Sequence, residues 1–111
     1  MGKGMADMQG FMREAQKQAR DMQRRMEQIE QGLKERIVEG TAGGGMVKAL
    51  VNGRQEIVAV KISREVVNPD DVEMLEDLVT AACAQGLKQS REMRDQEMQK
   101  VAGGLKLPGL F

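Results

Sequence analysis

The 111-residue sequence contains no histidine, tryptophan or tyrosine, and it has only two phenylalanines and one cysteine. Without histidine, both the most common general base and the imidazole metal ligand are missing. One cysteine cannot form an internal disulfide or a Cys-x-x-Cys site, so we expect a reducing compartment, the cytoplasm. The scarcity of aromatic rings excludes the base-stacking sheets of many single-strand-binding domains. These absences favour a binding or structural protein over an enzyme, and we expect no catalytic residue, metal, cofactor or small-molecule substrate.

Long apolar runs are also missing. No stretch approaches the roughly 18 residues that a membrane-spanning helix needs, and the first residues lack the apolar core of a signal peptide. We therefore expect no membrane association. The 17 basic and 17 acidic residues cancel, but residues 68–87 hold five acidic and no basic residues. The rest of the chain therefore carries a net charge of +5, and a polyanionic partner would have to bind a local basic patch.

The most regular feature is a seam of apolar residues spaced alternately by three and four. This spacing over nearly four heptads is typical of a coiled-coil-like helix, which we predict over about residues 5–33. A seam of this kind indicates a packing face. Its positions are Met5, Met8, Met12, Ala15, Ala19, Met22, Met26, Ile29 and Leu33.

Basic residues recur on the opposite face of this predicted helix. Arg13, Lys17, Arg20 and Arg24 are spaced to form one stripe, and Arg25 flanks it. The stripe extends over about 16 Å of helix axis, which suits two or three phosphates of a duplex. Two interpretations remain open from the stripe alone: a solvated outer face, or a nucleic-acid contact.

Three short segments rich in valine and isoleucine predict strands at about 35–41, 46–51 and 55–62. Asn52-Gly53 between the last two predicts a type I′ hairpin turn. Gly43–Gly45 lacks the pattern of a phosphate-binding loop, so we expect only a connection there. Both faces of such a sheet are largely apolar, which predicts a homodimer through the sheet. The expected interface residues are Val47, Val51, Val58, Val60 and Ile62.

A second long helix is predicted over about residues 69–102. Asn68 is the expected N-cap and Pro69 the first helical residue. The first half has a broad apolar face, whereas the second half is polar and carries Lys88, Arg91 and Arg94 at steps of three. This half is either a solvated arm or a further basic surface. Residues 105–111 have no periodicity, and we expect a flexible tail after a single domain at 1–104.

The order of these elements resembles the YbaB/EbfC family of bacterial nucleoid-associated proteins. The most specific match is the string Asn-Pro-Asp-Asp-Val-Glu-Met-Leu-Glu-Asp-Leu-Val at residues 68–79. Shorter matches lie at residues 2–4, 11–18, 43–48, 51–53 and 107–109.

This resemblance implies an α+β fold with the order α-β-β-β-α, assembled as a homodimer shaped like tweezers. It also implies binding to double-stranded DNA with loose sequence preference in the nucleoid, and effects on nucleoid organisation and gene expression. The basic residues on both helical arms would be the DNA contacts. These are Arg13, Lys17, Arg20, Arg24, Arg25, Lys88, Arg91 and Arg94.

A chaperone or scaffold of another class is the alternative, since prefoldin subunits also combine long coiled helices with a β-hairpin. Apolar residues near both ends of the chain could then clasp client proteins. Three predicted strands and a basic stripe argue against this alternative. Salt-sensitive DNA binding would separate the two hypotheses.

Overall fold

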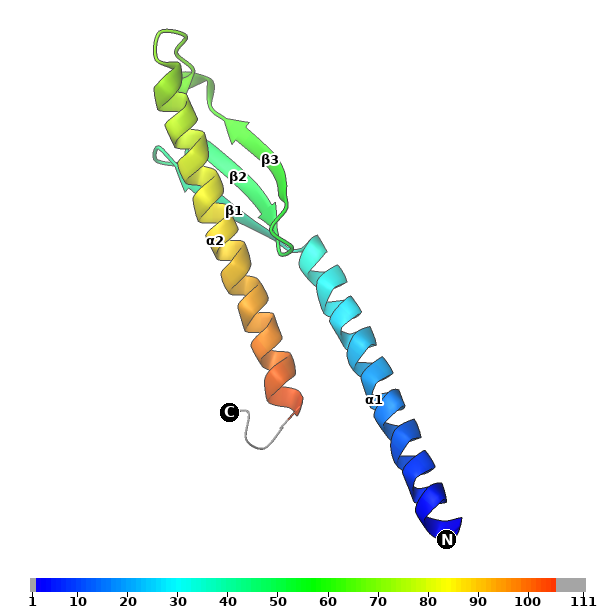
Figure 1. Ribbon diagram of the computed structural model, residues 1–111. Coiled ribbons are helices and arrows are strands. Elements are labelled where there is room, and N and C mark those ends of the chain that lie inside the picture. Colours follow the sequence, from blue (N-terminus) through cyan, green and yellow to red (C-terminus); the bar gives the residue numbers. More distant parts are fainter. Residues whose placement is uncertain (1, 106–111) are drawn as a thin grey trace. The chain divides into compact units, whose positions relative to one another are not determined.

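The computed structural model describes the backbone of residues 2–105 and the side chains of residues 7–103. The chain forms α1 (Gly2–Glu35), β1 (Ile37–Ala42), β2 (Val47–Asn52), β3 (Ile57–Ile62), the 3₁₀ turn η1 (Arg64–Val66) and α2 (Val72–Leu105) (Figure 1). The predicted α-β-β-β-α order is therefore confirmed. The chain divides after Gln31 into two compact units: most of α1, and everything that follows.

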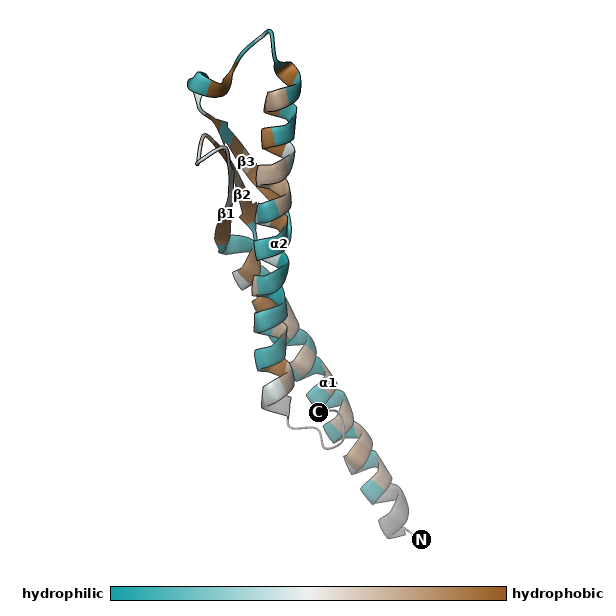
Figure 2. Ribbon diagram, turned by 90° about the vertical axis from the view of Figure 1, so that its left-hand side faces the viewer, coloured by the Kyte–Doolittle hydropathy of each residue, from teal (hydrophilic) through white to brown (hydrophobic). Residues whose placement is uncertain are grey.

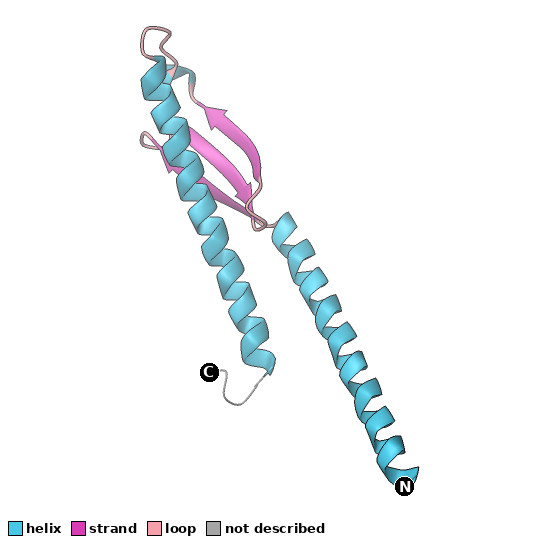
Figure 3. Cartoon of the chain, viewed as in Figure 1, coloured by secondary structure: helices cyan, strands magenta, loops and turns pink. Residues whose placement is uncertain are grey.

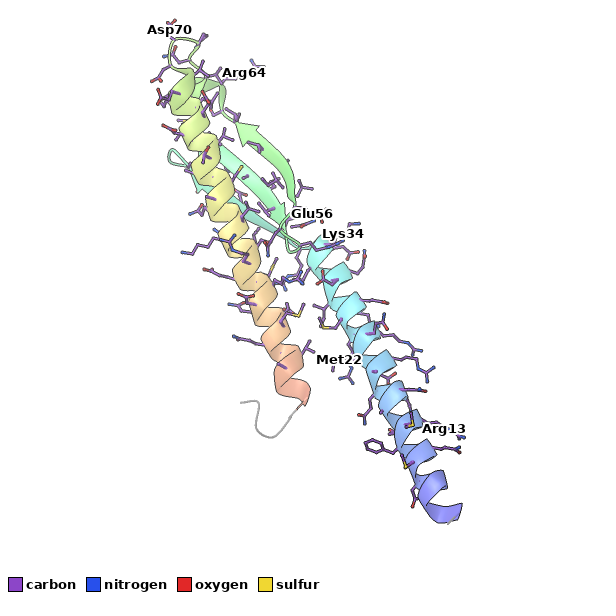
Figure 4. All side chains as sticks on the ribbon, viewed as in Figure 1. Arg13, Met22, Lys34, Glu56, Arg64 and Asp70 are labelled. Atoms are coloured by element: carbon purple, nitrogen blue, oxygen red, sulfur yellow. The ribbon has the colours of Figure 1, made fainter. Side chains whose placement is uncertain are left out.

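Helix α1 is longer than the predicted range of 5–33 by a few residues at each end. Gly32 does not end it, because the helix continues for another three residues to Glu35. Figure 4 shows Arg13 and Met22 on opposite sides of this helix. The apolar seam and the basic residues therefore occupy separate faces, as the spacing predicts.

The strands form an antiparallel sheet in the order β1-β2-β3, so β2 is central (Figure 3). Their bounds differ from the predicted ones by one or two residues. In the register, Val47 lies opposite Ile62 and Ala49 opposite Val60, which confirms that these residues share one face. An irregularity between Leu50 and Val51 shifts the rest of this pairing.

The hairpin between β2 and β3 is not the predicted type I′ turn. Neither Asn52 nor Gly53 has a positive φ; Gln55 does, at 64°. The loop closes with Gln55 N–H donating to the Asn52 carbonyl and Asn52 N–H donating to the Glu56 carbonyl. Asn52 Oδ1 also accepts from the amides of Arg54 and Glu56, both at 3.0 Å. These side-chain hydrogen bonds stabilise a wider loop than the dipeptide alone indicates.

Helix α2 begins at Val72, three residues after its predicted start. Asp71 is the residue that caps it, since its Oδ1 accepts a hydrogen bond from the Met74 amide at 3.2 Å. Asn68 instead closes the preceding turn, where its side chain accepts from the Asp70 amide. The helix runs to Leu105, past the glycines at 103 and 104. The rest of the predicted tail, residues 106–111, lies outside the described residues.

The core lies between α2 and one face of the sheet, which form two layers (Figure 2). Val47, Ala49 and Val51 of β2 are fully buried together with Ala82 of α2. The second half of α2 is more polar than the first, as its hydropathy colours show (Figure 2). Within residues 2–105, neither long helix contains a segment apolar enough to cross a bilayer.

Backbone packs on backbone where α2 crosses β1. A Cβ added to Gly40 would overlap the Ala82 carbonyl and the Gly86 amide, and would lie 2.8 Å from the Gly86 Cα. A Cβ on Gly86 would lie 2.7 Å from a methyl group of Val51. This pair of glycines brings the helix closer to the sheet than side chains would allow.

Candidate nucleic-acid interface

The first part of the candidate interface is the basic stripe of α1, defined here as Arg13, Lys17, Arg20 and Arg24. All four side chains are exposed. At about 3.6 residues per turn, they fall within an arc of about 60° around the helix axis. Among the described residues, none of the four has a carboxylate oxygen within ion-pairing distance. The stripe therefore presents four solvated cations along one line.

Arg25 is placed differently from the stripe. It lies about 100° further around the helix than Arg24, on the side that also carries Glu14 and Asp21. Asp21 precedes Arg25 by four residues, a spacing at which opposite charges attract on a helix surface. Asp21 stands four residues after Lys17 and three before Arg24, so it attracts these stripe residues as well as Arg25.

The chemistry of the stripe suits phosphate. Three of its four residues are arginines, whose planar guanidinium can donate two parallel hydrogen bonds to one phosphate. With a rise of about 1.5 Å per residue, the stripe covers about 16 Å of helix axis. A rigid helix thus holds the cations at fixed spacing, while its apolar seam faces the other way.

The second group of predicted contacts lies on α2, in the other compact unit. Lys88 and Arg91 are exposed, whereas Arg94 is half-buried. A step of three residues turns by about 60° relative to the helix axis, so these three residues follow an arc and not a line. The structure thus supports Lys88 and Arg91 as accessible cations on α2, and it places Arg94 at the edge of the covered face.

Further along α2, a small ion-pair cluster includes a residue that the sequence patterns did not single out. Glu97 Oε1 lies 3.0 Å from Arg36 Nη1 and 3.1 Å from Lys100 Nζ. The hydrogen bond from Lys100 is the main cause that holds the pKa of the Glu97 carboxyl below its ordinary value. Desolvation opposes it, and the hydrogen bond from Arg36 and the positive charges of both residues add to the lowering. Arg36 and Lys100 are therefore partly neutralised, in contrast to the stripe.

The predicted dimer-interface residues fall into two groups. Val47 and Val51 have no exposed surface, because α2 covers them in the chain's own core. Val58, Val60 and Ile62 on β3 are 39–58% exposed. The difference arises because α2 packs on β1 and β2 and hardly contacts β3. Only the β3 residues are therefore available to a partner.

Comparisons with known proteins point to one family. The profile of the YbaB/EbfC DNA-binding family matches residues 5–105. A nucleoid-associated protein of Syntrophobacter fumaroxidans is 52% identical over 93 residues, which are 84% of each chain. Another, from Caldanaerobacter subterraneus, is 53% identical over 95 residues, 86% of each chain. The crystal structure of an uncharacterized Helicobacter pylori protein superposes with a TM-score of 0.72 at 25% identity, covering 79% of this chain and 92% of the other.

Proposed function

The chain belongs to the YbaB/EbfC DNA-binding family, and we propose that it binds duplex DNA with loose sequence preference through the basic stripe of α1. The observation that carries this proposal is the stripe itself: four exposed, unpaired cations on one face of a long helix. Contacts of this kind read the phosphate backbone, which is the same for every sequence. The composition offers only two aromatic rings, both phenylalanines, for stacking on bases.

Lys88 and Arg91 on α2 are a second set of DNA contacts in the proposal, and Arg25 and the half-buried Arg94 are further contributors. All four residues add positive charge. Because long-range attraction depends on the summed charge, these residues raise the rate of encounter with DNA even where they make no direct contact.

The protein acts as a homodimer in this proposal. Val60 and Ile62 lie on the same face of the sheet as the buried Val47 and Ala49, yet α2 leaves them uncovered. An exposed apolar edge strand is a surface that soluble proteins normally cover. A second copy covers it by symmetry, and a dimer carries two basic stripes.

The cellular role follows from this mode of binding. A dimer that contacts phosphates at two places can bridge or stiffen DNA wherever it lands. We therefore assign the protein to the nucleoid, within the cytoplasm, with effects on nucleoid organisation and gene expression. The relatives named above as nucleoid-associated support this assignment.

A mobility-shift titration tests the proposal. Two duplexes of equal length and unrelated sequence are titrated with the protein at several salt concentrations. The logarithm of the association constant should fall linearly with the logarithm of salt, by about 0.9 for each phosphate neutralised. The two duplexes should bind with similar affinity. No binding, or affinity that does not change with salt, would contradict the proposal.

A chaperone-like role is the second candidate, and one observation favours it. Met8, Phe11 and Met12 on α1 are all more than half exposed, which leaves apolar groups near the end of that helix available to clients. Two results together would select this alternative. The titration above would show no DNA binding, and a separate assay would show that the protein suppresses aggregation of an unfolded client.

A further inference from the structure

The face of the sheet opposite α2 carries two lysines directly across from each other. In the register of β2 and β3, Lys48 pairs with Lys61. Their neighbours along both strands, Val47 and Ile62, belong to the face that α2 packs on, so the two lysines point to the other side. This outer face is not covered by α2, and both lysines are exposed.

Like charges at directly opposed positions of an antiparallel pair repel each other, since their Cβ atoms are only about 4.5–5.5 Å apart. One of the two charges has a partner: Lys48 Nζ lies 3.5 Å from Glu39 Oε1. That pair is about half exposed on both sides, so it is weak. Among the described residues, Lys61 has no acidic partner. Lys48 and Lys61 together therefore keep a net positive charge, which an external anion would neutralise.

The surroundings of the two lysines also suit an anion. They line a depression of about 260 Å³ together with Gly45, Met46, Ile62 and Ser63. This volume is several times the roughly 30 Å³ that one water molecule occupies in the liquid. Gly45 has a φ of 90° and open space where a side chain would be, so its backbone is accessible there. The Ser63 hydroxyl is a further possible donor at the rim.

We propose that Lys48 and Lys61 form an anion-binding site on the outer face of the sheet, and that it takes a phosphate of the DNA backbone. The inference rests on the proposed function, because a bound duplex is what brings a phosphate to this face. The two lysines lie on the face of the sheet opposite the proposed dimer residues Val60 and Ile62, although Ile62 also borders the depression. The site adds residues of the sheet to the proposed DNA contacts.

The first test compares the double variant Lys48→Gln/Lys61→Gln with wild type in the salt titration. The slope of log affinity against log salt should flatten by about one to two units per chain if each lysine meets a phosphate. The matched control is Lys34→Gln/Arg64→Gln, which removes the same charge at two other exposed positions. The control should change the slope by less. Equal slopes for wild type and the Lys48/Lys61 variant would overturn the site.

A second test measures the protection of the lysines by DNA and does not depend on a loss of affinity. Lysine acetylation by a small reagent is measured residue by residue with and without duplex DNA. Protection of Lys48 and Lys61 by DNA supports the proposal, and unchanged labelling of both while the wild type binds DNA overturns it without touching the proposed function. Failure of the wild type to bind any duplex would overturn both.

The melting temperature shows whether the variant folds and whether the site binds free phosphate. Without anions, the double variant should melt at or above the wild-type temperature, because it removes a like-charge pair. Inorganic phosphate at millimolar concentration should raise the melting temperature of wild type more than that of the variant. If free phosphate protects both lysines from acetylation but DNA does not, the site serves free phosphate and the assignment to DNA is wrong.

Discussion

The Ser90 hydroxyl on α2 donates a hydrogen bond to the Asn52 carbonyl at 2.6 Å, across 38 residues of sequence. The same oxygen accepts a hydrogen bond from the Gln55 amide at 3.2 Å. Ser90 is fully buried, although it lies in the polar half of the helix. One side chain therefore satisfies a donor and an acceptor of the β2–β3 loop and ties that loop to α2.

Replacing Ser90 with alanine removes both of these hydrogen bonds, while the Gln55 amide and the Asn52 carbonyl keep the hydrogen bond that joins them to each other. Each lost hydrogen bond contributes about 0.5–1.5 kcal/mol, so we expect the free energy of unfolding to fall by about 1–3 kcal/mol in urea titrations. Thr80→Ala is the control, because the Thr80 hydroxyl is exposed and bonds only to the Glu76 carbonyl in its own helix. Equal losses for the two variants would show that Ser90 makes no special contribution.

The contact between Gly40 and Gly86 predicts that the effect of a glycine-to-alanine change on stability depends strongly on its position. Gly40→Ala should prevent α2 from seating on β1, because the new methyl group would meet backbone atoms that cannot move alone. We expect loss of the cooperative thermal transition or a markedly lower melting temperature. Gly10→Ala in α1 should be neutral or stabilising by up to about 1 kcal/mol, since that site is open and alanine favours helices. A stable Gly40→Ala variant would contradict the packing described here.

The ion pairs of Glu97 predict a dependence of stability on pH. The pKa of Glu97 is lowered in the folded chain, so the folded state binds its proton less readily than the unfolded state does. The stability that the cluster contributes is present above the ordinary carboxyl pKa and is lost as pH falls through the lowered value. The difference in unfolding free energy between wild type and Glu97→Gln should be largest near neutral pH and should shrink in acid. A difference that stays constant with pH would argue against this role.

Dimerisation is tested on β3. Val60→Asp places a charge within the surface that we propose a second copy covers, and burying an unpaired charge is costly. We expect sedimentation to give a dimer for wild type at micromolar concentration, and monomeric or unfolded protein for the variant. Ala81→Asp at an exposed position of α2 is the control and should remain dimeric. A folded wild-type monomer would contradict the proposed assembly.

Local patterns in the sequence were sufficient for much of the fold. The seam from Met5 to Leu33 predicts α1 because a single period governs all its positions, and the valine-rich runs predict the strands to within two residues. The two local predictions that were wrong, the hairpin turn and the cap of α2, depend on short-range hydrogen bonds. Asn52 bonds to Arg54 and Glu56 and widens the hairpin, and Asp71 takes the cap that Asn68 was predicted to provide.

Features that depend on distant contacts could not be predicted. Arg36 and Glu97 pair across 61 residues, and no spacing rule connects them. The interface prediction treated Val47 and Val60 alike, because periodicity assigns both to one face. Only the position of α2 over β1 and β2 separates a buried Val47 from an exposed Val60. The basic stripe could be predicted from the sequence because it lies on a single helix, where the spacing of residues alone determines which of them share a face.

The basic stripe of α1 carries the proposed contact with DNA, and the salt slope of a variant that lacks the stripe tests this contact most directly. Changing Arg13, Lys17, Arg20 and Arg24 to glutamine should leave helix content and dimerisation nearly unchanged, because glutamine is a good helix former at solvated positions. The matched variant changes Lys88, Arg91 and Arg94 to glutamine.

For the stripe variant, we predict weaker binding to duplex DNA and a slope that flattens by up to about four units per chain. The α2 variant should lose less affinity. Wild-type binding by the stripe variant together with failure of the α2 variant would move the DNA surface to α2. Wild-type affinity and slope in both variants would contradict the proposal that the basic residues of the helices contact DNA.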